Sequence, residues 1–170
     1  AILLCVLQSQ LALAQAPPWQ WARDSRSNNT EAAFDAAVNP STGDVFITGL
    51  YSGGLNGAAA FNSATFTATN GSTDIYIAKY NSVGTFQWAI EIGGTGADGG
   101  RSIALDPSGN IYVTGYFNGT VDFDPSGGTF NITSTGGQDA FIAKYSSAGA
   151  FLWAARGGGA STDIGYGIYA

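Results

Sequence analysis

Histidine is absent from this sequence, and cysteine occurs once, as Cys5. The chain therefore lacks the commonest general base, and a single cysteine allows neither a zinc cluster nor a disulfide framework. Charged residues are also scarce, at 11%, and acidic groups outnumber basic ones to give a net charge of −6. A surface of that sign repels phosphate backbones and anionic lipids, so the sequence predicts no nucleic-acid partner.

A long apolar run is missing as well, since a bilayer-spanning helix needs about 20 apolar residues. Residues 1–16 are apolar but are interrupted by glutamine and serine, and they end in small-residue motifs. This pattern predicts a truncated signal peptide of the Sec pathway, cleaved after Ala14 or Ala16. Cleavage after Ala14 is favoured, because Pro17 would directly follow the other bond. The mature protein is then expected to be secreted or at the cell surface, without stable membrane insertion; a buried core segment is the alternative interpretation.

Glycine and aromatic residues are abundant instead, with 25 glycines and 13% aromatics. A hydrophobic content of 45% is enough for a packed core and argues against disorder. Few charges with many Gly, Thr, Tyr and Phe residues are typical of short strands joined by tight turns.

An internal repeat organises the chain. Asp74–Ala89 and Asp139–Ala154 are 65 residues apart and agree at ten of sixteen positions. The segments 43–49 and 109–115 match in the same way, at an offset of 66. One tryptophan marks the same place in three successive units, at Trp21, Trp88 and Trp153. The chain therefore divides into a first repeat over 17–97, a second over 98–162 and the start of a third over 163–170.

Each unit carries the pattern of four short strands. In the second unit we expect strands over 101–106, 110–117, 139–145 and 150–155, with a Pro-Ser-Gly-Asn turn at 107–110. Four antiparallel strands repeated radially are typical of a propeller blade. The predicted fold is all-β, with two four-stranded antiparallel blades and the start of a third, as a fragment of a β-propeller.

The motifs DAFIAKYSSAGAFLWA and GRSIALDPSGNIYVTGYF resemble the bacterial SBBP-type β-propeller repeat. The resemblance covers nearly all of residues 19–170. It implies a secreted or surface protein, often large, with a seven-bladed propeller and no agreed catalytic activity. The first unit departs from the pattern by one extra residue in the turn 40–44, which leaves its register open.

Gly94, Gly96 and Gly99 formally match a dinucleotide-binding fingerprint. That fingerprint requires a helix after the glycines, whereas a short strand is expected here, so a loop between blades is the favoured interpretation.

A residue that occurs at the same position in both units is most simply expected to have a structural role. Lys79 and Lys144 are expected to run along apolar surface and to meet a carboxylate or carbonyl partner. Asp74 and Asp139 are expected to cap turns. The repeated tryptophans are expected to pack between blades, with a sugar-stacking surface as the alternative.

The loop between Asn118 and Gly137 differs between the units and is the favoured position for a site. Asp122 and Asp124 are two residues apart, so in an extended segment both carboxylates could contact one Ca²⁺. An Asp-Pro-Ser-Gly-Gly turn explains Asp124 without a metal, and nothing indicates a paired-carboxylate glycosidase. No other cofactor is predicted. Four N-x-S/T sequons, relevant only with a matching transferase, begin at Asn28, Asn70, Asn118 and Asn131.

The leading functional hypothesis is a non-catalytic, exported β-propeller segment that acts as a scaffold or as a binding surface for a protein or glycan. The remaining blades of the parent chain are its expected intramolecular partners. The alternative is the propeller portion of a secreted polysaccharide-active hydrolase or lyase with catalytic residues elsewhere. A third possibility is a self-assembling structural protein.

Overall fold

A computed structural model describes residues 30–52, 66 and 72–170 of the chain. Its elements are all strands: β1 (Glu31–Val38), β2 (Val45–Ser52), β3 (Thr73–Tyr80), β4 (Phe86–Gly94), β5 (Gly99–Leu105), β6 (Ile111–Phe117), β7 (Thr120–Asp122), β8 (Asn131–Thr133), β9 (Asp139–Tyr145) and β10 (Phe151–Gly157). Among the described residues no helix is long and apolar enough to cross a membrane. The predicted all-β fold is confirmed, as are the four strands expected in the second unit.

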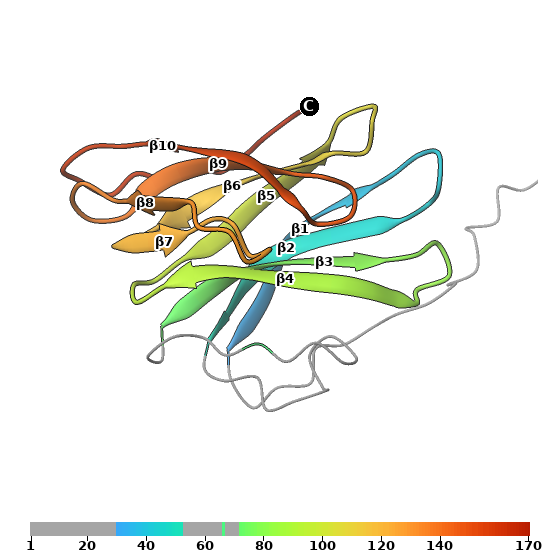
Figure 1. Cartoon of the computed structure of the whole chain (residues 1–170), viewed down its shortest axis with the longest axis horizontal. Coiled ribbons are helices and arrows are strands. Elements are labelled where there is room, and N and C mark those ends of the chain that lie inside the picture. The colour runs from blue at the N-terminus through green and yellow to red at the C-terminus, as the bar shows by residue number, and fades with distance from the viewer. Residues whose placement is uncertain (1–29, 53–65, 67–71) are drawn as a thin grey trace, which may run out of the picture.

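Two antiparallel sheets form, one with the order β1-β2-β3-β4-β7-β8 and one with the order β10-β9-β6-β5 (Figure 1). We call β1–β4 blade 1, and β5, β6, β9 and β10 blade 2. Tight turns with a left-handed glycine join the strands, as at Gly109 (φ +79°) in the predicted turn after β5. The extra residue of the first unit is absorbed in the corresponding turn, where Asn39 N–H donates to the Asp44 carbonyl and Gly43 has φ +73°.

The blades converge at their first strands, because β5 contacts β1, β2 and β3. Between the blades lies a buried core to which both contribute. Ile75 and Ile77 come from β3 of blade 1, and Phe141 and Tyr145 come from β9 of blade 2. Each of these side chains is at most 1% exposed. This blade-on-blade packing is that of a β-propeller fragment.

A hairpin that the sequence analysis treated as a loop, β7–β8, is inserted between β6 and β9 of blade 2. It crosses to the other blade and pairs with β4, with Gly93 opposite Asp122 and Gly94 opposite Val121. Figure 1 shows the hairpin between β4 and β9, on the side away from β1 and β5. Its signal in the sequence is a short alternation of apolar and polar residues, over 120–123 and 130–133. The first sheet therefore has six strands rather than four.

Candidate binding site

The two candidate calcium ligands lie where β7 leads into the tip of the hairpin. Asp122 Oδ1 accepts hydrogen bonds from the backbone N–H groups of Asp124 (3.0 Å) and Phe130 (2.8 Å). Asp124 Oδ1 accepts from Ser126 N–H at 2.9 Å and from the Ser126 hydroxyl. In the described part of the chain, no three or more acidic or cysteine side chains gather as a metal site would require. The Ca²⁺ site stays a prediction, which a calcium titration of the melting temperature would test.

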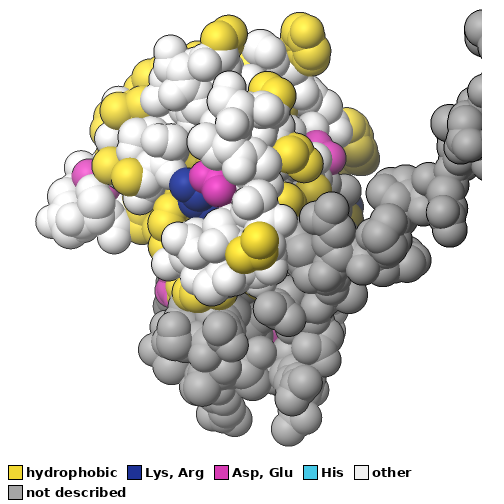
Figure 2. All heavy atoms as spheres, turned by 90° about the vertical axis from the view of Figure 1, so that its right-hand side faces the viewer, with side chains coloured by type: hydrophobic (Ala, Val, Ile, Leu, Met, Phe, Trp, Pro, Cys, Tyr) yellow, Lys and Arg dark blue, Asp and Glu magenta, His cyan; other side chains and the backbone are white. Residues whose placement is uncertain are grey.

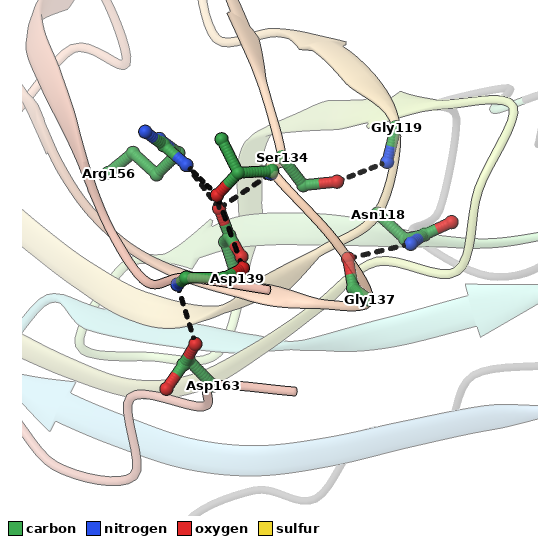
Figure 3. A network of polar contacts seen from close by, with 9 residues as sticks. Asn118, Gly119, Ser134, Gly137, Asp139, Arg156 and Asp163 are labelled. Carbon is green, nitrogen blue, oxygen red and sulfur yellow. Dashed lines mark hydrogen bonds and ion pairs between the residues drawn. The ribbon is translucent and has the colours of Figure 1, made fainter. Parts of the chain in front are cut away.

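The base of the hairpin is held by polar contacts (Figure 3). The Asn118 side-chain amide donates to the Gly137 carbonyl at 2.8 Å. The backbone N–H of Asn118 donates to Asp98 Oδ1 at 2.9 Å. Gly119 N–H donates to the Ser134 hydroxyl at 2.9 Å, and Ser134 N–H returns a bond to the Gly119 carbonyl. The sequon residue Asn118 is thus part of the scaffold, whereas Asn131 is exposed on β8.

Asp139 closes the same network from β9. Its buried carboxylate accepts from Thr135 N–H at 3.0 Å and pairs with the Arg156 guanidinium at 2.6 Å. Burial opposes ionisation of Asp139, but hydrogen bonds from Arg156 and Thr135 outweigh it and lower its pKa. At the equivalent position in blade 1, Asp74 accepts from the Ser72 hydroxyl at 3.2 Å. The turn-capping role predicted for Asp139 is confirmed.

Both repeated lysines have carboxylate partners, as predicted. Lys79 Nζ lies 2.9 Å from Asp44, and Lys144 Nζ lies 3.2 Å from Asp106. The two acids come from opposite ends of the equivalent turn, since Asp44 ends the turn of blade 1 and Asp106 begins that of blade 2. The hydrogen bond from Lys79 lowers the pKa of Asp44, and bonds from Asn110 and Lys144 lower the pKa of Asp106 to about 2.

Of the repeated tryptophans, Trp21 lies outside the described residues. Trp88 packs against the core between the blades, with its ring 6.1 Å from that of Phe46 and its edge against Gly149 of blade 2. The predicted packing between blades is therefore confirmed for Trp88. Trp153, its counterpart in blade 2, is 40% exposed and contacts Tyr112 of its own blade.

The glycine-rich connection does not carry the dinucleotide fingerprint. β4 ends at Gly94 and β5 begins at Gly99, so a strand follows where that fingerprint needs a helix. A Cβ atom at Gly96 would overlap the carbonyl oxygen of Asn118. The absence of a side chain at Gly96 is therefore explained by the close approach of the β6–β7 connection.

Two open depressions lie between the blades. One, of about 340 Å³, separates the β1–β2 turn, with Val38 and Pro40, from the β5–β6 turn, with Leu105 and Pro107. We call it the turn groove. The other, of about 260 Å³, lies between Ile90 on β4, the hairpin tip and the β9–β10 turn. Figure 2 views the molecule from the end that carries the turns joining the blade strands, and this surface is mostly uncharged, with basic atoms next to acidic ones.

Comparison with known proteins supports the fold. Residues 87–124 match the family model described as a β-propeller repeat, SBBP. A WD repeat-containing protein of Acanthamoeba polyphaga mimivirus, itself described as uncharacterized, is 34% identical over 84 residues, which is 48% of this chain and 6% of that protein. The regulatory protein FlaEY of Caulobacter vibrioides is 27% identical over 134 residues, or 79% of this chain and 14% of that protein.

The chain thus spans a small part of the relatives that it matches. The matched segment runs from β4 of blade 1 through β5 and β6 to the hairpin, so it contains the connection between the two blades. The repeated sequence motifs, the two blades and the family match all indicate β-propeller repeats. Residues 87–124 are thus similar to the SBBP type of β-propeller repeat, and the two blades that they connect form a repeat scaffold.

Proposed function

We propose that this chain is a non-catalytic, exported β-propeller segment that acts as a scaffold and as a binding surface for a protein or glycan, together with further blades. The observation that supports it most is the use of the repeated charged groups. Lys79, Lys144 and Asp139 each form an ion pair or a capping bond inside the scaffold. These contacts give the repeated charged residues a structural role that needs no substrate.

The turn groove is the favoured binding surface. It lies between the turns of two blades, and its lining mixes apolar side chains such as Val38 with polar groups such as Asn39, as ligand sites usually do. Because its volume of about 340 Å³ is open to solvent, it suits part of an extended ligand better than an enclosed small molecule.

A glycan array probed with the chain tests this proposal, and Val38→Arg is the informative variant. Val38 is 59% exposed at the groove, and Val83, which is 70% exposed on the β3–β4 turn, provides the matched control. We expect Val38→Arg to weaken binding at least tenfold and Val83→Arg to leave it unchanged. Equal binding by both variants would contradict the groove, and release of reducing sugar ends from a bound polysaccharide would favour the hydrolase or lyase alternative.

Export is tested separately by placing an initiator Met and a short basic segment before Ala1, so that residues 1–16 serve as the apolar part and cleavage site of the signal peptide. Amino-terminal sequencing of the exported protein should begin at Gln15 or Pro17. A protein that retains residues 1–14 after export would contradict the signal-peptide prediction.

A further inference from the structure

The outer strands of the two blades differ in length, although both lead into a pair of glycines. β4 continues to Gly94, whereas β10 ends at Gly157, although Gly158 and Gly159 are the counterparts of Gly93 and Gly94. The two additional residues of β4 are those that pair with β7 of the following unit. The longer strand is thus the one whose last two residues have a pairing partner.

Gly94 and Gly159, at the ends of the two outer strands, also differ in what surrounds them. A Cβ atom at Gly94 would overlap the Thr120 carbonyl of β7, so glycine is required there by the approach of the hairpin strand. At Gly159 a Cβ atom would meet nothing within 4 Å. Nothing in the described part of this chain therefore explains why Gly159 lacks a side chain.

The face beside this edge is also uncovered in blade 2. Ile77 of blade 1 is fully buried against blade 2, whereas its counterpart Ile142 is 43% exposed. Trp88 packs into the core between the blades, whereas Trp153 is 40% exposed. The positions that blade 1 uses to receive blade 2 are thus repeated on blade 2, with the same residue types.

Residues 163–168 already make the contacts that begin a following unit. Asp163 N–H donates to Gln138 as Asp98 N–H does to Thr73, both at 2.7 Å. Gly159 N–H donates to Asp163 Oδ2 at 2.9 Å, as Gly94 N–H does to Asp98 Oδ2 at 3.0 Å. Ile168 N–H donates to the Ser102 hydroxyl at 3.3 Å, in the place where Ile103 N–H donates to Asp35 Oδ2 at 2.9 Å.

We propose that Gly158 and Gly159 are the docking edge for the inserted hairpin of the repeat unit that begins at Asp163, which lays a β7-type strand along them. The hairpin is then a clasp, by which each unit holds the outer strand of the unit before it. This inference rests on the proposed presence of further blades and adds which atoms join them.

A tandem chain tests the clasp, made by joining residues 1–162 to a second copy of residues 98–170. Its junction repeats the natural connection, because Asp98 takes the place of Asp163. In the tandem chain the second copy of Trp153 is replaced by phenylalanine, and docking of the added unit should shield the first Trp153 from a soluble fluorescence quencher. The amide protons of Gly158 and Gly159 should exchange at least tenfold more slowly than in the 170-residue chain.

Gly159→Val then separates the clasp from simple stacking. In the 170-residue chain, Gly159→Val should shift the melting temperature by less than about 1 °C. In the tandem chain, the same variant should lower the melting temperature by about 5 °C or more. Gly94→Val in the 170-residue chain is the positive control. A shielded Trp153 with no effect of Gly159→Val on melting or exchange would overturn the clasp alone. An unshielded Trp153 would overturn both the clasp and the further blade.

Discussion

The side chain of Asp98 joins the end of blade 1 to the base of the β7–β8 hairpin. Its carboxylate is buried and accepts N–H bonds from Gly94, at the end of blade 1, and from Asn118, at the base of the hairpin. Desolvation raises its pKa to about 7, although the two backbone bonds favour the charged form. One side chain therefore ties the connection between the blades to the clasp and carries its own pH dependence.

The pH dependence of Asp98 has a defined sign. Its pKa is raised on folding from about 3.8 to about 7, so the folded state binds more protons than the unfolded state between these values. This contribution to stability is complete below about pH 4 and is lost as the pH rises through 7. We expect Asp98→Asn to abolish a slope of up to about 1.4 kcal/mol per pH unit in this window, measured by urea unfolding.

Asp106→Asn is the control for this experiment. The pKa of Asp106 is lowered to about 2, so its contribution is present above pH 4 and is lost as the pH falls toward 2. The two variants should therefore change different limbs of the stability profile. An unchanged slope between pH 4 and 7 in Asp98→Asn would show that the carboxyl group does not titrate in this window.

At the scale of elements, the β7–β8 hairpin contributes more to the core than its length suggests. Phe123 follows β7 directly and is fully buried, with its ring 5.5 Å from Phe117 and 5.1 Å from Phe141. The Phe123 carbonyl accepts a bond from the Tyr145 hydroxyl at 3.0 Å. The first unit offers the same pairing, because Phe66 lies 5.5 Å from Tyr51, the counterpart of Phe117. An aromatic residue from the inserted segment thus packs on the second strand of each blade.

Phe123→Ala should destabilise the chain by about 3–5 kcal/mol, because it leaves a cavity between the blades that neighbouring side chains cannot fill. Phe130→Ala, opposite Phe123 across the hairpin, is the control: Phe130 is 41% exposed, so a much smaller loss is expected. Chemical denaturation measures both. Similar losses for the two variants would mean that the hairpin acts through its turn and not through Phe123.

At the scale of the whole molecule, two blades cannot close a ring. The outward face of blade 2 exposes Ile142 (43%), Leu152 (47%) and Trp153 (40%). Large apolar side chains gathered on one exposed face favour association with a second apolar face. We expect residues 17–170, expressed alone, to self-associate and to be cleaved readily by proteases.

Lysine at Ile142 and Leu152 together should convert residues 17–170 to a monomer, as measured by light scattering. The control is Val83→Lys, which adds a charge on an exposed turn and should leave association unchanged. A wild-type chain that is already monomeric and melts in one sharp transition would contradict the expectation.

Much of this protein follows from its sequence alone. The 65-residue repeat predicted two blades, their strands and the turn at Gly109, since alternation of apolar residues and turn chemistry are local signals. Repetition also predicted structural roles for Lys144 and Asp139, because a residue that recurs in every unit most simply helps to hold each unit together. These assignments depend on neighbours within one blade, and the repeat itself marks which residues form a blade.

The tertiary structure alone decided what lies between blades. A strand of three residues such as β7 has too short a pattern to predict which strand it pairs with. Its pairing with Gly94 depends on the position of blade 1 in the folded chain. The burial of Phe123 and the raised pKa of Asp98 likewise arise from segments that meet only after the blades have packed. The internal repeat thus determined the blades, whereas the packing of one blade on the next determined the clasp, because its contacts join residues of two different repeat units.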